Sequence, residues 1–387
     1  MRIAITNPFT QAYLRRGAER FSQDLAAFLH SRGHDVTLIA AQPGRSEMNT
    51  SSGYRALSFR RLWLPALARI GIHEHHAFFW PVLQALLRGR YEVVVSCQYM
   101  DALAASLARS FTGVPCVFAF VGMPPQVIDY RSLSLGGRFI RSAVRRANTV
   151  MCPSGYVESY LTRRWQVPSV RIPVPVNTRL FCQSGERDHG RPVILCAAAL
   201  YESRKGGRLL MRAFDLLKAR RPEPVLQIVY PLSAEVRHRL LELVSPQWRD
   251  DVQFLPDAGN QLPALYGKAA ISVLPSLWEA YGLVVLESMA TGTPVVGTRS
   301  GALPELITHP GVGRLFDPGD AQSPEPTNAV GLMEAMAECL DLSRRPETSE
   351  RCRQRAEECD WSRLGPRFEA LILETARSSE VAACTSS

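Results

Sequence analysis

Residues 275–307 have the sequence PSLWEAYGLVVLESMATGTPVVGTRSGALPELI, and this stretch decides the fold. It follows a short, apolar and β-branched run, Ile271–Leu274, which predicts a buried parallel strand. Leu283–Thr291 has helical character and stops at Gly292, a residue type favoured just past a helix end. Pro294–Gly297 then predicts the next strand. A strand, a loop, a helix and a strand in this order predict one unit of a parallel α/β sheet.

Two glutamates, Glu279 and Glu287, lie eight residues apart in this nearly uncharged segment. Glu279 falls in the loop at the carboxyl end of the first strand, where open α/β sheets bind ligands, and Glu287 falls in the helix. The helix start at Leu283 and Val284 offers free backbone N–H groups and the positive end of the helix dipole, which bind phosphate. Carboxylates accept hydrogen bonds from hydroxyl groups, so the pattern favours a nucleotide sugar. The alternative is a surface helix whose two glutamates are solvated. Two glutamates without further signals would favour this alternative.

The segment Pro275–Val296 resembles the E-x7-E signature of the retaining glycosyltransferases of family 4. These enzymes have the GT-B fold, in which two Rossmann-like domains with doubly wound parallel sheets face each other across a cleft. Other segments resemble landmarks of the same family, in the same order along the chain. They are Gly17–Arg20, the phosphate-binding loop Arg204–Gly207, Gly301–Glu305, Leu315–Asp320 and a closing helix that begins at Trp361. The resemblance spans nearly the whole chain and implies a hexosyltransferase-like enzyme.

This resemblance also implies roles for single residues. Lys205 would hold the diphosphate of the donor, with Arg204 as a second cation, and Glu279 would contact hydroxyls of the donor sugar. Lys205 and Glu279 are the predicted catalytic residues, and Glu287 would bind both ribose hydroxyls. Donor binding would be completed by the backbone around the start of the helix, at Ala280, Tyr281, Gly282, Leu283 and Val284. Gly17, with Arg16 before it, would form a loop that gives room for phosphate near the acceptor.

In members of this family the anomeric configuration is retained without a placed protein nucleophile, and the leaving phosphate oxygen takes the proton of the acceptor. The chain has no Asp-x-Asp motif, which would indicate a metal-held diphosphate. The resemblance therefore implies transfer without a metal or cofactor other than the donor substrate. The chain departs from the family at Ala198-Ala199-Leu200, where an arginine is expected, at Tyr230-Pro231, and at Phe118–Pro124, which lacks the donor-site histidine. These changes favour an unusual donor or acceptor, or a weakened enzyme.

The length of 387 residues is too great for one ordinary core and predicts two domains. Strand and helix patterns alternate twice, on either side of the proline-rich stretch Val170–Pro192. We expect an acceptor-binding Rossmann-like domain at 1–180 and a donor-binding Rossmann-like domain at 181–357. Residues 358–387 are expected to form a helix that packs back on the first domain, with a frayed tail after Thr375.

Charge is distributed unevenly along the chain. Residues 1–185 contain 22 arginines, no lysine and 9 acidic residues, whereas the remainder is slightly acidic. A basic half attracts an anionic membrane, nucleic acid or a phosphorylated acceptor, but no nucleic-acid recognition motif accompanies the charge. Arg60–Ile70, followed by Phe78–Trp80, mixes arginine with aromatic residues. This mixture suits a segment in a membrane interface, and equally a packed helix with solvated arginines.

The nine cysteines are scattered, odd in number and without a C-x-x-C pair, which argues against a disulfide framework and a zinc site. The first residues lack the long apolar core of a signal peptide. We expect a cytoplasmic enzyme of polysaccharide or lipid-linked glycan synthesis, with peripheral contact at the inner face of the cell membrane. Two alternatives are a soluble transferase that acts on a small metabolite and a non-catalytic protein that binds nucleotide sugars or partners.

Overall fold

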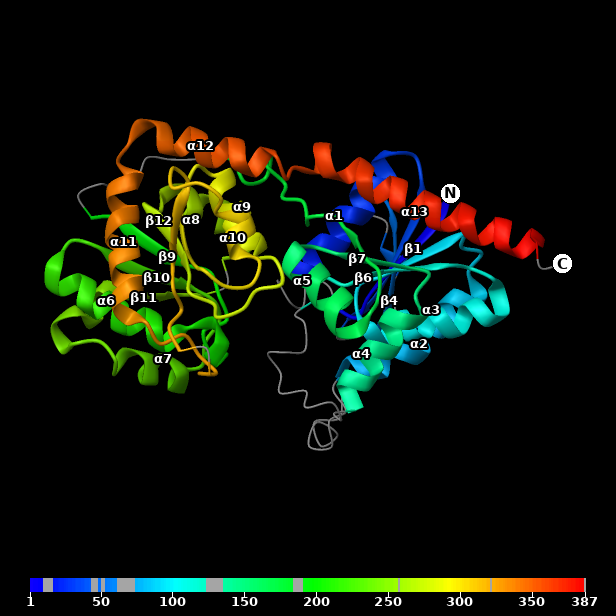
Figure 1. Cartoon of the computed structure of the whole chain (residues 1–387), viewed down its shortest axis with the longest axis horizontal. Coiled ribbons are helices and arrows are strands. Elements are labelled where there is room, and N and C mark those ends of the chain that lie inside the picture. Colours follow the sequence, from blue (N-terminus) through cyan, green and yellow to red (C-terminus); the bar gives the residue numbers. More distant parts are fainter. Residues whose placement is uncertain are drawn as a thin grey trace. The chain divides into compact units, whose positions relative to one another are not determined.

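The computed structural model describes residues 1–9, 17–42, 48–49, 53–60, 74–122, 135–183, 191–256, 258–320 and 322–385. The chain divides into two compact units, and each contains one parallel sheet (Figure 1). Unit 1 consists of Met1–Val174 and Trp361–Ser387, and unit 2 consists of Pro175–Asp360. The predicted class, α/β with two doubly wound parallel sheets, is confirmed.

The sheet of unit 1 has eight strands in the order β3-β4-β2-β1-β5-β6-β7-β8, all parallel except the short β3 at one edge. The strands are β1 (Arg2–Asn7), β2 (Asp35–Gln42), β3 (Met48–Asn49), β4 (Arg55–Arg60), β5 (Val93–Ser96), β6 (Cys116–Ala119), β7 (Thr149–Cys152) and β8 (Val170–Arg171). All four residues of β5 are buried, as are all four of β6, because helices cover both faces of the sheet.

The helices of unit 1 form two layers. Those on one face are α1 (Gly17–Ser31) and α13 (Trp361–Thr385), and those on the other are α2 (Phe79–Arg88), α3 (Tyr99–Thr112) and α4 (Leu135–Arg146) (Figure 1). A 3₁₀ turn, Glu74–Phe78, precedes α2. Residues 155–165 form α5 (Gly155–Tyr160) and a π-helical turn (Leu161–Trp165) that ends at Gln166 with φ 55°.

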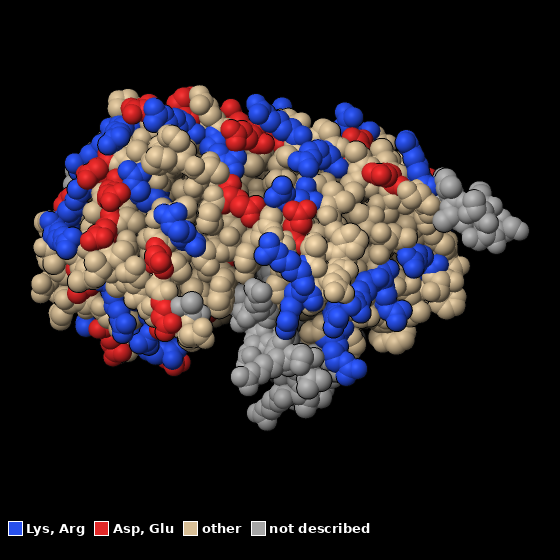
Figure 2. Space-filling view, viewed as in Figure 1, with Lys and Arg blue, Asp and Glu red and all other residues tan. Residues whose placement is uncertain are grey.

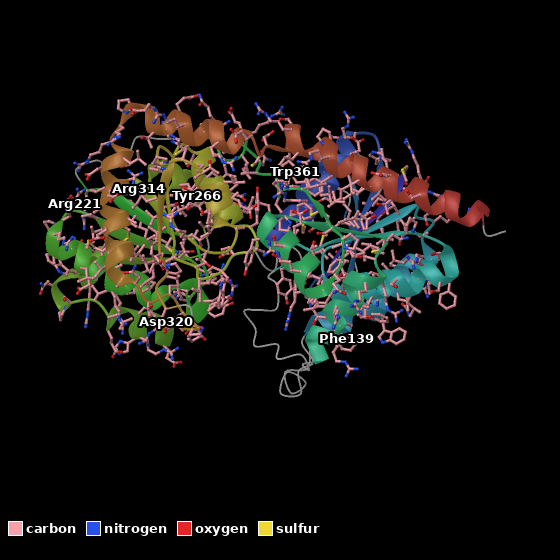
Figure 3. The ribbon with its side chains drawn as sticks, viewed as in Figure 1. Phe139, Arg221, Tyr266, Arg314, Asp320 and Trp361 are labelled. Carbon is pink, nitrogen blue, oxygen red and sulfur yellow. The ribbon has the colours of Figure 1, made fainter. Side chains whose placement is uncertain are left out.

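Helix α13 closes unit 1 by packing on α1. The Trp361 ring, labelled in Figure 3, stacks on Phe28 at 5.7 Å between ring centroids. A Cβ added at Gly365 would lie 2.4 Å from the Phe28 ring, so only glycine allows this close approach. Glu369 accepts hydrogen bonds from His34 at 2.9 Å and Arg32 at 3.0 Å. The helix continues to Thr385, beyond the point where the tail was expected to fray, because the residues after 375 are rich in good helix formers and contain no glycine or proline.

The sheet of unit 2 has six parallel strands in the order β11-β10-β9-β12-β13-β14. They are β9 (Val193–Cys196), β10 (Val225–Val229), β11 (Val252–Leu255), β12 (Ile271–Leu274), β13 (Val295–Thr298) and β14 (Gly313–Phe316). The chain winds outward from β9 to β11 and then returns to place β12 on the other side of β9. The order of the strands therefore reverses between β9 and β12, and such a point is where doubly wound sheets bind ligands.

The helices of unit 2 are α6 (Gly207–Arg220), α7 (Ala234–Leu241), α8 (Leu262–Lys268), α9 (Leu283–Ala290), α10 (Leu303–Leu306), α11 (Ala329–Ser343) and α12 (Pro346–Glu357). Short 3₁₀ turns lie at Ser203–Lys205, Pro246–Asp251 and Gly259–Gln261. Tyr266 of α8, labelled in Figure 3, is fully buried in this unit and contacts the Phe181 ring. Ile194–Cys196 of β9 and all four residues of β12 are buried, so the strands that lead to the predicted site lie in the core of unit 2.

Two further features concern the cysteines and the lengths of the helices. In the described ranges, eight cysteines carry free thiols, and seven of these are buried. None of the helices in those ranges combines the length and the apolar character needed to cross a bilayer.

Candidate active site

The candidate site lies in unit 2, at the carboxyl ends of two neighbouring parallel strands. β9 leads into the 3₁₀ turn Ser203–Lys205, and β12 leads into residues 275–282 and then α9. Both loops therefore leave the sheet at the same edge and at the point where the strand order reverses. This is the position from which open α/β sheets bind ligands.

The two loops are in direct backbone contact. Leu277 N–H donates a hydrogen bond to the carbonyl oxygen of Arg204 at 2.7 Å. Gly206 has φ +71°, and a Cβ added there would lie 2.3 Å from the carbonyl oxygen of Pro275. Only glycine combines this backbone conformation with so close an approach. The contact therefore fixes the loop after β9 against the loop after β12.

An ion pair joins the two loops at their centre. Lys205 Nζ donates to Glu279 Oε1 at 2.5 Å, and the two side chains are only 16% and 11% exposed. Burial by itself raises the pKa of the Glu279 carboxyl, but the charges of Lys205 and Arg204 outweigh it and hold the pKa below its ordinary value. The carboxyl of Glu279 is therefore an anion at neutral pH.

Arg204 is the second cation of this cluster. Its Nη2 forms an ion pair with Glu202 Oε2 at 2.6 Å, and its Nη1 donates to the carbonyl oxygen of Trp278 at 3.4 Å. The cluster thus contains two cations and two carboxylates on loops that the backbone holds together. Such a set can bind a diphosphate through the cations and hydroxyl groups through the carboxylates.

The backbone of Glu279 is fixed by a further close approach. Gly301 has φ +60°, and an added Cβ would lie 2.7 Å from both the N and the O of Glu279. Ala302 N–H donates to the Glu279 carbonyl oxygen at 3.0 Å. The sequence did not indicate roles for Glu202, Gly301 or Gly206. The signal that could have identified the two glycines is their place in the segments that resemble the family.

Helix α9 begins immediately after this loop. Gly282 at its N-cap has φ +98°, a conformation that other residues rarely adopt. The Ala280 and Tyr281 side chains are buried, so these residues can offer a ligand only their backbone. Leu283 is buried and Val284 is half-buried in the first turn. Glu287 is 3% exposed and is the single charged residue of α9.

The other predicted residues lie in unit 1. Gly17 is the first residue of α1, whereas Arg16 lies outside the described residues, as do residues 61–70 of the proposed membrane segment. In the part of that segment that is described, Phe78 is buried and Trp80 is 65% exposed. The structure thus brings Lys205, Arg204 and Glu279 together in unit 2, with Glu287 on the helix that follows.

Unit 1 contains a buried polar cluster that the sequence did not indicate, at the carboxyl ends of β1 and β5. Thr6 Oγ1 donates to Asp101 Oδ2 at 2.7 Å, and Gln98 N–H donates to Asp101 Oδ1 at 2.9 Å. Asn7 Nδ2 donates to Ser22 Oγ at 3.1 Å. Complete burial raises the pKa of Asp101 to about 7. The cluster therefore lies at the carboxyl ends of the strands, which is the end of a parallel sheet at which a ligand of unit 1 would bind.

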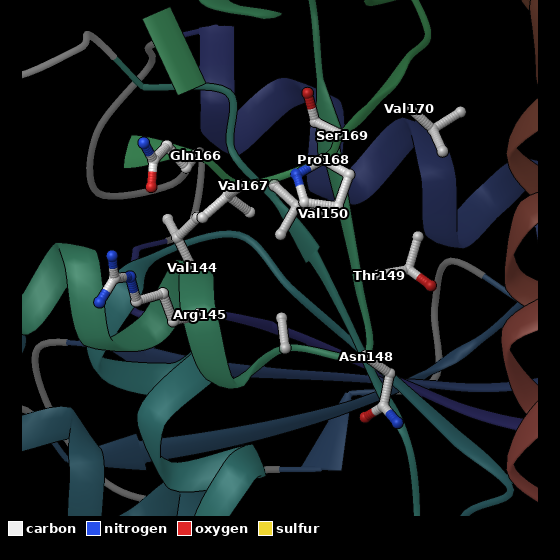
Figure 4. A pocket seen from close by; sticks show the side chains of 11 residues that line it. Val144, Arg145, Asn148, Thr149, Val150, Gln166, Val167, Pro168, Ser169 and Val170 are labelled. Carbon is white, nitrogen blue, oxygen red and sulfur yellow. The ribbon is translucent and has the colours of Figure 1, made fainter. Parts of the chain in front are cut away.

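A hollow of about 550 Å³ lies elsewhere in unit 1, where the end of α4 meets β7 and β8 (Figure 4). Six of its eleven lining residues are apolar, and the polar ones are Arg145, Asn148, Thr149, Gln166 and Ser169. It contains none of the predicted site residues. No group of three metal-ligating side chains is found within the described ranges.

Comparison with known proteins gives a match in each half of the chain. A family model described as "Glycosyltransferase Family 4" matches residues 15–180, and a model described as "Glycosyl transferases group 1" matches residues 191–337. Together they span most of both units.

Two curated relatives are similar over most of the chain. A D-inositol 3-phosphate glycosyltransferase of Pseudarthrobacter chlorophenolicus is 29% identical over 311 residues, which cover 74% of this chain and 70% of the relative. A phosphatidyl-myo-inositol mannosyltransferase of Propionibacterium freudenreichii is 24% identical over 384 residues, which cover 96% of this chain and 94% of the relative.

Solved structures are similar over the full length. Sucrose-phosphate synthase from Thermosynechococcus elongatus has a TM-score of 0.80 at 18% identity, covering 97% of this chain and 99% of that one. Anabaena HepE in complex with UDP-glucose has a TM-score of 0.66 at 16% identity, covering 100% of both chains. At these identities the likeness shows the fold alone, and it confirms the predicted GT-B class.

Replacing Gly206 tests the contact between the loops. Gly206→Ala requires a left-handed backbone and places a methyl group against the Pro275 carbonyl, so we expect a loss of about 2–4 kcal/mol in the free energy of unfolding. Gly33→Ala is the matched control, because Gly33 also has a positive φ but nothing within 4 Å of the added Cβ, and should lose only about 1 kcal/mol. Urea unfolding measures both losses. Equal losses would contradict the loop contact.

The ion pair predicts a pH dependence of stability. Because the folded-state pKa of Glu279 is below its ordinary 4.5, the stabilisation is present above pH 4.5 and is lost as the pH falls through the folded-state pKa. We expect Glu279→Gln to be less stable than wild type by roughly 1–3 kcal/mol at neutral pH, with the difference shrinking in acid. Glu334→Gln, on an exposed position of α11, is the control. A difference that stayed constant from neutral pH into acid would show that the pair does not act as described.

Proposed function

Because the chain belongs to the glycosyltransferases of family 4 and has the GT-B fold, we propose that it is a retaining, metal-independent transferase that moves a sugar from a nucleotide-diphosphate donor to an acceptor hydroxyl. The observation that carries this proposal is the cluster of Lys205, Arg204 and Glu279 on two joined loops at the strand reversal of unit 2. It combines the groups that a diphosphate and a sugar require.

We assign donor binding to unit 2. Lys205 and Arg204 hold the diphosphate and stabilise the negative charge that develops on it as the glycosidic bond breaks. Glu279 accepts hydrogen bonds from the donor sugar, and Glu287 binds the ribose hydroxyls. The first turn of α9, at Leu283 and Val284, adds backbone N–H donors. The bound UDP-glucose of the similarly folded HepE supports a nucleotide sugar as the donor.

The proposed chemistry needs no protein nucleophile. The ammonium of Lys205 lies 2.5 Å from the carboxylate that would contact the sugar, so the diphosphate and the sugar are bound by groups that are already in contact. The leaving phosphate oxygen accepts the proton of the acceptor hydroxyl, and attack from the same face retains the configuration. Preorganised charges of this kind act at the atoms where charge develops, which is where they lower the barrier.

We assign acceptor binding to unit 1, with Gly17 and Arg16 beside the acceptor. A growing polysaccharide or lipid-linked glycan at the inner face of the membrane is the acceptor class that we favour. Support comes from the excess of arginine in residues 1–185 and from the likeness to a phosphatidyl-myo-inositol mannosyltransferase over 96% of the chain. A soluble metabolite is the second candidate, supported by the likeness to a D-inositol 3-phosphate glycosyltransferase.

A panel of UDP-, GDP- and ADP-sugars tests the proposal directly. We expect release of nucleoside diphosphate from at least one donor when glycan, lipid-linked and inositol phosphate acceptors are supplied in turn. The acceptor that accelerates release separates the two acceptor classes. If no donor of the panel gave release of nucleoside diphosphate, the result would instead favour a non-catalytic protein that binds nucleotide sugars.

Three substitutions test the site, and a fourth is the control. Lys205→Met is expected to lower kcat about 100-fold because it removes charge at the leaving group, and Glu279→Gln is expected to lower kcat more than nucleotide affinity. Glu287→Ala should weaken donor binding about 10- to 100-fold through the loss of charged hydrogen bonds. Glu334→Gln, on an exposed position of α11, should match the wild type. Steady-state kinetics and calorimetry measure these effects, and wild-type values for both Glu279→Gln and Glu287→Ala would refute the site assignment.

Metal independence is tested by measuring turnover after chelation of divalent ions. Turnover should persist after treatment with EDTA, because Lys205 and Arg204 supply the positive charge that a divalent ion supplies elsewhere. The matched comparison is Lys205→Met with and without added Mg²⁺. Loss of wild-type turnover on chelation, with recovery on adding Mg²⁺, would show that this part of the mechanism is wrong.

A further inference from the structure

Unit 1 carries an exposed surface that the transfer reaction does not use, made by the outward faces of α2, α3 and α4. Helix α3 packs against both α2 and α4, so the three helices form one layer on one side of the sheet (Figure 1). Side chains on the inner side of this layer are buried against the sheet. We call the outer side of this layer the helical face.

Large apolar side chains gather on the helical face. The described residues include nine large hydrophobic side chains that are exposed, and four of them lie on α2 and α3. They are Trp80 (65% exposed), Leu87 (43%), Leu107 (40%) and Phe111 (74%). Trp80 and Leu87 lie seven residues apart on α2, and Leu107 and Phe111 lie four apart on α3, so each pair forms an outward stripe of its helix. Four exposed large apolar side chains on two helices that pack together are typical of an interaction surface.

The same face is basic and carries no exposed carboxylate. Helix α4 has four exposed arginines and no acidic residue: Arg138, Arg141, Arg145 and Arg146. Across α2, α3 and α4 the single acidic residue is Asp101, which is fully buried. In Figure 2, blue atoms gather over the position that Figure 1 labels α4, and red atoms are seen elsewhere on unit 1. The arginines therefore have no acidic side chain on these helices to neutralise them.

We propose that the helical face docks unit 1 on an anionic lipid bilayer. The apolar side chains of α2 and α3 enter the region between headgroup and acyl chain, where Trp80 has both its apolar ring and its polar N–H satisfied. The arginines of α4 pair with lipid phosphates at the same depth. The inference relies on the proposed function only for the identity of the acceptor. Binding of the chain to lipid requires neither the donor nor the acceptor.

The combination of charges and apolar groups selects the bilayer over other partners. Nucleic acid would use the arginines but has no place for exposed leucine and phenylalanine side chains on the same face. A second copy of the chain, related by twofold symmetry, would bring the arginine stripes of α4 into one interface, where like charges repel. An anionic bilayer provides both an apolar layer and negative charge, and it matches both properties of the face.

The arginine contribution is tested by flotation of the full chain with vesicles. The lipids are phosphatidylcholine alone, or phosphatidylcholine with about one third phosphatidylglycerol. Each arginine at an anionic surface strengthens partition about five-fold, so Arg138, Arg141, Arg145 and Arg146 changed together to Gln should weaken it by more than about 100-fold. The control changes four exposed arginines of unit 2 in the same way, Arg212, Arg239, Arg344 and Arg345, and should partition close to wild type. Wild type should bind vesicles of phosphatidylcholine alone more than about 100-fold more weakly than the anionic vesicles, with only the contribution of its apolar side chains.

The apolar contribution is tested at high salt, where surface charge is screened. Trp80→Ser combined with Phe111→Ser should lose the partition that wild type retains at about 0.5 M salt, by about 10-fold or more. Leu216→Ser combined with Val330→Ser, which are exposed apolar positions of unit 2, is the control and should behave as wild type. Circular dichroism verifies that each variant is folded.

Several outcomes would overturn the proposal. The first is a wild-type chain that does not float with anionic vesicles, and the second is variants of the helical face that float as well as their controls. A third is binding of duplex DNA that the α4 variant loses, without vesicle binding, which would assign the face to nucleic acid. A fourth is dimerisation that the Trp80 and Phe111 variant loses, without vesicle binding. None of these results depends on transferase activity, so they are separate from a failure of the proposed function.

Discussion

The candidate site depends on one constraint, the close contact between the loop after β9 and the loop after β12. Gly206 allows the backbones to approach, and the Leu277 N–H bond to the Arg204 carbonyl oxygen at 2.7 Å holds them. Without that contact Lys205 and Glu279 would belong to separate flexible loops. With it they form a buried ion pair whose geometry is set by the sheet below. The parallel sheet matters to function chiefly because its strand reversal places these two loops side by side.

The parts of the fold that rest on strong local patterns were predictable from the sequence. The bounds of β12 coincide with the predicted run Ile271–Leu274, because it is a short apolar segment in the interior of a parallel sheet. The turn at Leu161–Trp165 was not predictable in detail, since its π-helical form ends at a non-glycine residue with positive φ. Helix α13 runs past Thr375 because propensity there favours helix, whereas the short polar side chains had suggested a frayed tail.

The residues of the candidate site also divide into those that the sequence could predict and those that it could not. Lys205 and Glu279 could be predicted because they stand in segments with recognisable neighbours, and the parallel sheet then brings those segments together. Gly301 and the buried Asp101 could not, because their roles come from contacts with residues distant in the sequence. Glu202 lies only two residues from Arg204, but the sequence does not show that the two side chains pair. Glu202 matters only through its ion pair with Arg204, and Gly301 only through its approach to the Glu279 backbone. Contacts of this kind have no local signature in the sequence.

The charges of the site also bear on the missing arginine of the phosphate loop. Ala199, at the position where the resemblance places that arginine, is buried, and we propose that Arg204 of the turn Ser203–Lys205 takes its place. Its charge is balanced by Glu202, as that of Lys205 is balanced by Glu279, so the four side chains have no net charge. A diphosphate that bound both cations would therefore have to replace these carboxylates as their partners. In the proposed reaction that replacement frees Glu279 for the sugar hydroxyls, so binding of the diphosphate and recognition of the sugar become a single event.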